Sequence, residues 1–166
     1  YPYGCTEQLA SRLLPLVPLR ELAKDFNFPL PKNVGAVVDK TVADILARQR
    51  GDGGFGMWPD SPESSSWVST YALWTLYQAK ARGAAVPARA IDQAKGYVRR
   101  YLEQAREDEL WLVSAAFIVD VLAEVGAPDT GYMSRLYERR KKMPLFGQAL
   151  LLHALSVSKQ KREMID

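Results

Sequence analysis

The sequence predicts an all-α protein made of stacked antiparallel helical hairpins, and two observations carry this prediction. Apolar residues recur at intervals of three and four, and few stretches alternate with a period of two. Residues 67–79 also align with residues 111–123 at an offset of 44, with tryptophan over tryptophan at one end and alanine over alanine at the other. A weaker third echo lies at residues 148–156. A repeat of this size indicates either an open solenoid or a closed ring of hairpins.

The first helix is expected to begin at about Cys5, with leucines on its apolar face. Pro15 and Pro18 are expected to break or kink it, because proline lacks an N–H and clashes with the preceding turn. A loop at residues 26–31 separates it from a second helix at about residues 32–48, whose apolar face is made of valines and one isoleucine.

The third helix is expected to begin in the serines at residues 64–66, which are good N-cap residues, and to end near Gly83. It carries four aromatic side chains at helical spacing, and we expect them to belong to the core rather than to line a ligand cavity. These residues are Trp67, Tyr71, Trp74 and Tyr77.

Turn residues and apolar periodicity place the remaining helices. Pro87 fits the first turn of the fourth helix, and Gly126 ends the fifth, at about residues 108–124. The third and fifth helices are the more apolar ones, whereas the fourth and sixth carry charges typical of a solvent-facing helix. The sixth and seventh helices are expected at about residues 130–141 and 145–158.

The composition fits one globular domain and argues against a nucleic-acid partner and against a membrane span. The chain has 166 residues, 48% hydrophobic and 25% charged, with a net charge of +3. Two basic clusters, at residues 139–142 and 159–162, predict solvated surface and no nucleic-acid partner, because such binding needs a basic stripe with aromatic neighbours. No apolar run approaches the roughly 18 residues of a membrane span. The chain opens without methionine or a signal peptide, so we expect a piece of a longer protein.

The sharpest local feature is the string Gly4-Cys5-Thr6-Glu7-Gln8. Residues i and i+3 share a helix face, so the sulfur of Cys5 and the side-chain carbonyl of Gln8 can meet. Attack of the sulfur on the Gln8 amide, with loss of ammonia, would form an internal thioester, an activated acyl group that a lysine amine or a hydroxyl can take. An inert Cys5 is the alternative, because a free cysteine is usually a small buried hydrophobe.

This string, at a helix start before an all-helical repeat, resembles the thioester motif of the alpha-2-macroglobulin and complement family. Members carry Cys-x-Glu-Gln at the start of a helical thioester domain, so the resemblance implies a bond between Cys5 and Gln8. Thr6 departs from the Gly or Leu common at its position, which has no covalent role. Glu7 is not a bond partner and would support the helix N-terminus electrostatically.

A second string resembles the Q-x-x-D-G-G-F-x-x-W turn of α/α toroids, a fold that includes terpene cyclases, prenyltransferase β subunits and thioester domains. Its glycines permit a tight turn, and its two aromatic residues are expected to pack between neighbouring helices. The resemblance implies that the stack of hairpins is a partial α/α toroid and that this turn is structural. The matching residues are Gln49, Asp52, Gly53, Gly54, Phe55 and Trp58.

A third resemblance extends the likeness to most of the chain. Residues 136–140 and 143–150 are similar to the later helices of bacterial thioester domains of this family. A full domain of this type has about six hairpins and the chain supplies about three. Residues 1–166 are therefore expected to form the N-terminal half of a thioester domain.

His153 is the single histidine of the chain. Complement-like relatives use a histidine downstream of the Cys to take up the acyl group, but the segment that would bear it is shorter here, between Gln104 and Leu110. We interpret His153 as structural because its helical neighbours are apolar. Without such a histidine, direct attack by amines should dominate.

The resemblance implies a module of a broad-spectrum endopeptidase inhibitor, not an enzyme, that traps attacking proteases through their surface lysines. It also implies contacts with other domains of the same protein and a periplasmic or cell-envelope location. No cofactor is expected, and one His with one Cys cannot build a zinc site of four protein ligands. The alternatives are an enzyme of the toroid fold, which would need metal ligands or acidic motifs absent here, and a helical-repeat interaction module with an inert Cys5.

Overall fold

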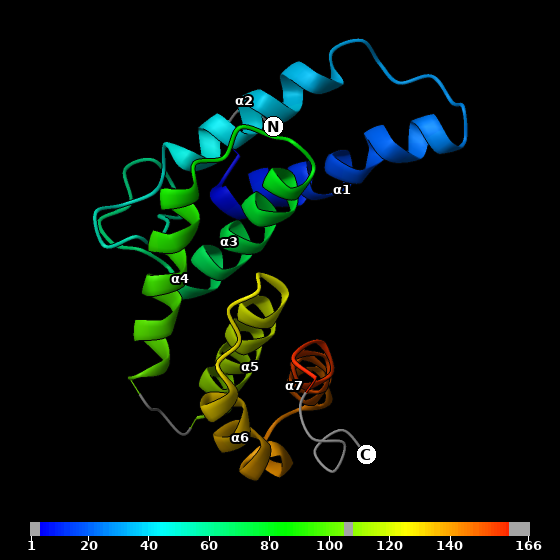
Figure 1. Cartoon of the computed structure of the whole chain (residues 1–166). Helices are drawn as coiled ribbons and strands as arrows, with labels where there is room; N and C mark the ends of the chain where they lie inside the picture. The colour runs from blue at the N-terminus through cyan, green and yellow to red at the C-terminus, as the bar shows by residue number, and fades with distance from the viewer. Residues whose placement is uncertain (1–3, 105–107, 160–166) are drawn as a thin grey trace. The chain divides into compact units, whose positions relative to one another are not determined.

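The computed structural model describes residues 4–104 and 108–159, and the regular elements in these ranges are all helices. The β pairing found in them is an isolated bridge between Gln49 and Phe55. The prediction of an all-α protein is therefore confirmed. The elements are α1 (Thr6–Asp25), α2 (Val34–Leu46), α3 (Ser66–Ala81), α4 (Ala88–Leu102), α5 (Glu109–Glu124), α6 (Thr130–Glu138), the 3-10 turn η1 (Arg140–Lys142) and α7 (Leu145–Val157) (Figure 1).

The chain divides into two units, residues 1–94 and residues 95–166. The first unit holds α1, α2, α3 and the start of α4, and the second holds the rest of α4 with α5, α6 and α7. Each unit is described by itself below.

In the first unit, α1 packs against both α2 and α3. Figure 1 shows α1 and α2 side by side, joined by the loop that follows α1. The spacing of four between Leu9, Leu13 and Val17 puts these residues on one face of α1, and all three are buried. The buried apolar side chains of α2 and α3 include Val34, Val38, Val42, Ile45, Val68, Leu73 and Leu76.

The helix α1 continues through Pro15 and Pro18, so of the predicted break or kink the break is wrong, and the kink stays a prediction. A proline removes one N–H and leaves the carbonyl four residues earlier without its helical partner. For Pro15 that carbonyl belongs to Ser11, and both residues are exposed, so water can hydrate the free carbonyl. The buried side chains of Leu13 and Val17 hold the opposite face of the helix in place.

The aromatic residues of α3 do not form its core, which corrects the prediction. Trp67 is 41% exposed and the other three are half-buried. Tyr71 and Trp74 contact each other with ring centroids 6.1 Å apart. Helical spacing predicts that residues share a face, but it does not predict which face is buried. The buried face of α3 is made of smaller residues, among them Val68, Ala72, Leu73, Leu76 and Ala79.

In the second unit, α5 packs against α6 and α7. The side chain of Asp108 caps α5 by accepting a hydrogen bond from the backbone N–H of Trp111 at 2.8 Å. The side chain of Asp129 caps α6 in the same way, by accepting from the backbone N–H of Tyr132 at 2.9 Å. The hydroxyl of Tyr132 donates to the carbonyl of Leu102 at 2.6 Å. Most residues of α5 are buried, as the repeat predicts for the apolar helix of each pair.

The helices α4 and α6, with the residue that follows each, carry the charged residues that the sequence predicts to face solvent. All of these residues are exposed: Arg99, Arg100, Glu103, Arg135, Glu138 and Arg139.

In the described part of the chain, no helix is both long and apolar enough to cross a lipid bilayer.

Candidate functional site

Cys5 occupies the N-cap position, directly before the first residue of α1. Its carbonyl accepts a helical hydrogen bond from the N–H of Leu9 at 3.0 Å. Its own N–H donates to Oε1 of Gln8 at 3.1 Å, which is one half of a capping box because Gln8 stands at the third helical position. The side chain of Gln8 therefore folds back to the residue that carries the thiol.

The carboxylate of Glu7 lies near the sulfur, and the hydroxyl of Ser11 binds this carboxylate. The Sγ atom of Cys5 lies 3.9 Å from Oε2 of Glu7, and Oε1 of Glu7 accepts a hydrogen bond from the hydroxyl of Ser11 at 2.9 Å. The Ser11 hydroxyl also lies 3.2 Å from the hydroxyl of Tyr71 on α3. These contacts hold Glu7 close to the sulfur, in addition to the support that its charge gives to the helix N-terminus.

The site is accessible on the side of Gln8. Cys5 is half-buried, whereas Gln8 is exposed. A small nucleophile can therefore approach the side-chain carbonyl of Gln8 from solvent. A pocket of about 250 Å³ adjoins it, lined by Gly4, Gln8, Leu9, Ser11 and Arg12.

The opposite side of this segment is bonded to the chain between α2 and α3. Thr6 is fully buried; its N–H donates to the carbonyl of Met57 at 2.9 Å, and its hydroxyl donates to the carbonyl of Gly56 at 2.6 Å. The guanidinium of Arg48 donates to the carbonyl of Gly4 at 2.9 Å and to the hydroxyl of Thr6 at 3.2 Å. We call this set of hydrogen bonds the Thr6–Arg48 clamp.

The turn at residues 49–58 holds itself together through its first residue. Gln49 pairs with Phe55 in the isolated bridge. The side-chain amide of Gln49 donates to the carbonyls of Gly53, at 3.1 Å, and Ala90, at 2.8 Å. Gln49 therefore closes the turn and ties it to the start of α4.

Asp52 and Phe55 connect the same turn to the start of α3. A carboxylate oxygen of Asp52 accepts hydrogen bonds from the N–H of Gly54 at 3.0 Å and the hydroxyl of Ser64 at 2.8 Å. Phe55 is fully buried, and its N–H donates to the hydroxyl of Ser69 at 2.7 Å. The contacts of Gln49, Asp52 and Phe55 are all of the kind expected for a structural turn.

Trp58 does not pack between helices as the sequence suggested, because 47% of its surface is exposed. The backbone N–H of Trp58 donates to the hydroxyl of Ser61 at 2.8 Å. The chain leaves the buried part of the turn after Gly56, so the second aromatic residue of the motif lies near the surface of this unit.

Two glycines of the turn have no room for a side chain. Gly53 has φ of +89°, and a Cβ there would lie 2.5 Å from the carbonyl oxygen of Gln93. A Cβ on Gly56 would lie 2.8 Å from Cβ of Ser61. Close approach therefore explains the glycine at position 53 of the motif and the glycine at position 56 beside it.

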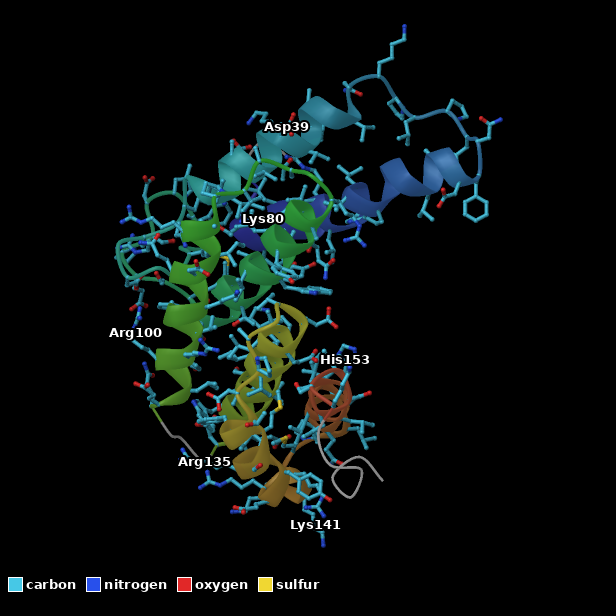
Figure 2. The ribbon with its side chains drawn as sticks, viewed as in Figure 1. Asp39, Lys80, Arg100, Arg135, Lys141 and His153 are labelled. Atoms are coloured by element: carbon cyan, nitrogen blue, oxygen red, sulfur yellow. The ribbon has the colours of Figure 1, made fainter. Side chains whose placement is uncertain are left out.

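His153 lies on α7 and pairs with α5 (Figure 2). Its Nδ1 is 2.7 Å from Oδ1 of Asp120, and its Nε2 is 3.6 Å from Oε1 of Glu124. Burial raises the pKa of Asp120, the hydrogen bond and charge interaction with His153 lower it, and Glu124 raises it. These contacts favour the structural interpretation of His153. In residues 4–104 and 108–159, no three His, Cys, Asp or Glu side chains group together so as to hold a metal ion.

Comparisons with known proteins agree on one kind of protein. No family model matches the chain. The curated alpha-2-macroglobulin of Escherichia coli (strain K12) is 28% identical over 148 residues, which cover 87% of this chain and 9% of that protein. A crystal structure of the part of native Escherichia coli alpha-2-macroglobulin that runs to its C-terminus matches with a TM-score of 0.84 at 24% identity, over 99% of this chain and 28% of that one.

A crystal structure of Salmonella alpha-2-macroglobulin reacted with methylamine matches with a TM-score of 0.84 and 26% identity, over 99% of this chain and 12% of that one. The chain is homologous to a C-terminal region of bacterial alpha-2-macroglobulins. It spans less than a tenth of the length of the curated bacterial alpha-2-macroglobulins that it matches.

Sequence reasoning did not identify Thr6 and Arg48 as parts of the site. Position 6 would not be bonded in a thioester between Cys5 and Gln8, and Arg48 lies just before the turn motif among scattered basic residues. A hydroxyl buried at a helix start needs a partner, and this one finds it 50 residues away, in Gly56.

Proposed function

We propose that this chain is the N-terminal half of the thioester domain of an alpha-2-macroglobulin-like endopeptidase inhibitor, with Cys5 and Gln8 as the thioester pair. The observation that carries the proposal is the capped helix start, where the side-chain carbonyl oxygen of Gln8 (Oε1) lies 3.1 Å from the backbone nitrogen of Cys5. The capping geometry keeps the acyl carbon of Gln8 next to the residue that bears the sulfur.

The chemistry of formation needs no group outside the chain. The Cys5 sulfur attacks the side-chain carbonyl carbon of Gln8, the thiol proton passes to the side-chain nitrogen, and the C–N bond breaks to release ammonia. Negative charge develops on Oε1 of Gln8 as the sulfur attacks. The N–H of Cys5, which points at that oxygen, stabilises this charge in the way that backbone amides stabilise other oxyanions.

In the capture step, Gln8 again carries the acyl carbon, and Cys5 becomes the leaving group. The amine of a protease lysine attacks the acyl carbon, forms an amide with the Gln8 side chain, and releases Cys5 as a thiol. Each thioester reacts once, so the proposed function is covalent trapping and not turnover. The exposure of Gln8 and the adjoining pocket support direct approach by an amine.

Homology supports the proposal at the level of the whole protein. The Salmonella relative has been obtained in a form reacted with methylamine, a small amine. We extend amine reactivity to this chain on the strength of its Cys5–Gln8 geometry. The rest of the inhibitor, including the segment that a protease would cleave first, then belongs to other domains, and we place the whole protein in the periplasm or cell envelope.

We also propose that the hairpins are part of an α/α toroid. The alternation of apolar helices (α3, α5) with charged ones (α4, α6) supports a ring in which one helix of each pair faces inward. Residues 1–166 would then make one thioester-containing domain together with further hairpins.

The experiment uses the full-length protein mixed with trypsin and resolved on a denaturing gel. The proposal predicts covalent adducts of inhibitor and protease, which pretreatment with methylamine abolishes and Cys5→Ala removes. Circular dichroism of the Cys5→Ala variant controls for folding. Adducts that form equally well in Cys5→Ala would show that the capture chemistry lies elsewhere.

A further inference from the structure

We infer that Thr6 and Arg48 are positioning residues for the thioester: the Thr6–Arg48 clamp fixes the first turn of α1 so that the Cys5–Gln8 bond forms and resists water. The inference rests on the proposed function and goes beyond it, because neither residue is part of the thioester or touches the acyl group. It concerns how long the activated bond survives in this particular chain.

The ends of a helix open more easily than its interior. The first four N–H groups of an α-helix have no partner within the helix, and terminal turns open at a small cost in free energy. In α1 the backbone N–H of Thr6 is one of these groups, and it donates a hydrogen bond to the carbonyl of Met57 at 2.9 Å. An external partner therefore closes the turn that holds Cys5 and Gln8.

The hydroxyl of Thr6 both donates and accepts hydrogen bonds across the clamp. It donates to the carbonyl of Gly56 at 2.6 Å and accepts from Arg48 at 3.2 Å, and Thr6 is fully buried. Position 6 thus connects the thioester segment to the turn through a polar contact that water does not reach.

Arg48 ties down the residue before the thiol as well. Its second guanidinium nitrogen donates to the carbonyl of Gly4 at 2.9 Å, so the residues on both sides of Cys5 are fixed by one side chain. A hydrogen bond from a charged donor is stronger than a neutral one. The chain can therefore pivot at Cys5 only if several bonds of the clamp break together.

The other end of the clamp is a rigid support. Gly56 and Met57 follow directly after Phe55, which is fully buried, and Gly56 lies so close to Ser61 that a Cβ there would be 2.8 Å from Cβ of Ser61. We therefore expect the turn at residues 49–58 to absorb little of any movement of the first turn. Loss of the clamp should bring Cys5 and Gln8 together less often before the thioester forms, and should admit water to the acyl carbon once it has formed.

The test measures spontaneous hydrolysis of the thioester in the full-length protein, read by mass spectrometry of the peptide that holds residues 5 and 8. Thr6→Val keeps the shape of the side chain and removes the hydroxyl, and we expect hydrolysis to accelerate about tenfold. Thr6→Ser keeps the hydroxyl and should restore the rate to within about twofold of wild type.

A matched control separates positioning from general destabilisation. Thr70 is also fully buried, but its hydroxyl donates only within α3, to the carbonyl of Ser66 at 2.8 Å. Thr70→Val removes a buried hydroxyl of the same unit and should leave the hydrolysis rate unchanged, because that hydroxyl does not touch the thioester segment. Equal acceleration in both variants would overturn the inference.

Arg48→Gln provides a second variant if Thr6→Val does not fold. We expect it to accelerate hydrolysis at least as much, because it removes the bonds to both Gly4 and Thr6. Its control is Arg50→Gln, since Arg50 belongs to the same loop but donates to Ser61 and Pro62. The rate in Arg50→Gln should match wild type.

Two outcomes count against two different claims. A wild-type protein without any thioester would refute the proposed function itself. A wild-type thioester whose hydrolysis is unchanged in Thr6→Val or Arg48→Gln would leave the proposed function intact and overturn the positioning role of the clamp.

Discussion

Two aromatic residues of one motif have different environments, although the sequence gives them equal weight. Phe55 is fully buried, whereas Trp58 is 47% exposed. The free-energy cost of truncating a side chain depends on the apolar surface it loses and on the cavity it leaves. The stability of the turn at residues 49–58 therefore depends on its phenylalanine much more than on its tryptophan.

Phe55→Ala is expected to lower the free energy of unfolding by about 3–5 kcal/mol, the usual cost of emptying a buried aromatic site. Trp58→Ala should cost only about 1 kcal/mol, because half of the ring already contacts water. Urea unfolding followed by circular dichroism checks both values. A larger loss for Trp58→Ala than for Phe55→Ala would mean that the tryptophan is covered in the folded protein.

The pairing of His153 with Asp120 predicts a pH dependence of stability. Because burial raises the folded-state pKa of Asp120 above its ordinary value of 3.8, the contribution of this residue is fully present below that value and is lost as the pH rises through the folded pKa. His153 opposes the rise in pKa, so His153→Ala should raise the pKa of Asp120 further and increase the loss at neutral pH.

Urea unfolding of His153→Ala should therefore show a deficit of about 1 kcal/mol at pH 7. The deficit should shrink as the pH falls below the raised folded-state pKa of Asp120, where this carboxyl becomes protonated in both proteins. Asp120→Asn is the control background, in which the pH dependence of the deficit should shrink to the part that comes from the contact between His153 and Glu124. A constant deficit in the wild-type background would argue against coupling between the two residues.

At the scale of elements, the turn between α2 and α3 is shaped by backbone approach. Gly53 has a positive φ and lies against the carbonyl of Gln93, whereas the space around Gly51 is open. The same substitution at these two glycines therefore separates backbone constraint from the general effect of replacing a glycine.

Gly53→Ala should destabilise the protein by about 2–4 kcal/mol, because it combines a strained backbone with a steric clash. Gly51→Ala should change stability by less than about 1 kcal/mol. Thermal unfolding of the two variants gives the comparison. Equal shifts would show that the close approach to Gln93 does not exist in solution.

The positions of the helices could be predicted from the sequence because caps and glycines are local signals. Asp108 and Gly126 bound α5 as expected, and Pro87 stands directly before α4. The continuity of α1 through Pro15 could not be predicted, because it depends on which side of the helix is solvated. The burial of Phe55 but not Trp58 depends likewise on neighbouring helices.

The candidate site was only partly predictable for the same reason. Cys5 and Gln8 are three residues apart, so helical geometry brings them together. Thr6 and Arg48 are 42 residues apart, and only the packing of α1 against α2 and its following turn joins them. Whether the pair forms the bond in this chain stays a prediction.

At the scale of the whole molecule, α7 exposes apolar side chains that a soluble surface would not normally display together. Leu145 and Phe146 are 83% and 58% exposed, and Leu152 and Val157 are also exposed. The proposed toroid would cover such a helix with a further hairpin, because large apolar patches are rare on monomeric surfaces.

The isolated chain of 166 residues is therefore expected to self-associate, and Leu145→Glu combined with Phe146→Glu should return it to a monomer in light scattering. It should also show a titratable Cys5 thiol, because the domains proposed to shield the thioester from water are missing. The charge control is Lys141→Glu with Lys142→Glu, two exposed positions in η1, which should not restore the monomer. A monomeric chain with a blocked Cys5 would show that residues 1–166 alone protect the thioester from water.

The central claim, a thioester between Cys5 and Gln8, is tested most directly by peptide mass spectrometry of the full-length protein with and without methylamine. Without amine, the peptide that holds both residues should be roughly 17 Da lighter than its sequence mass, because ammonia has left. With methylamine, the modification should lie on Gln8 and Cys5 should become a free thiol, and Cys5→Ala should show neither change. An unmodified Gln8 amide beside a free Cys5 in the untreated protein, with no methylamine incorporated, would contradict the claim.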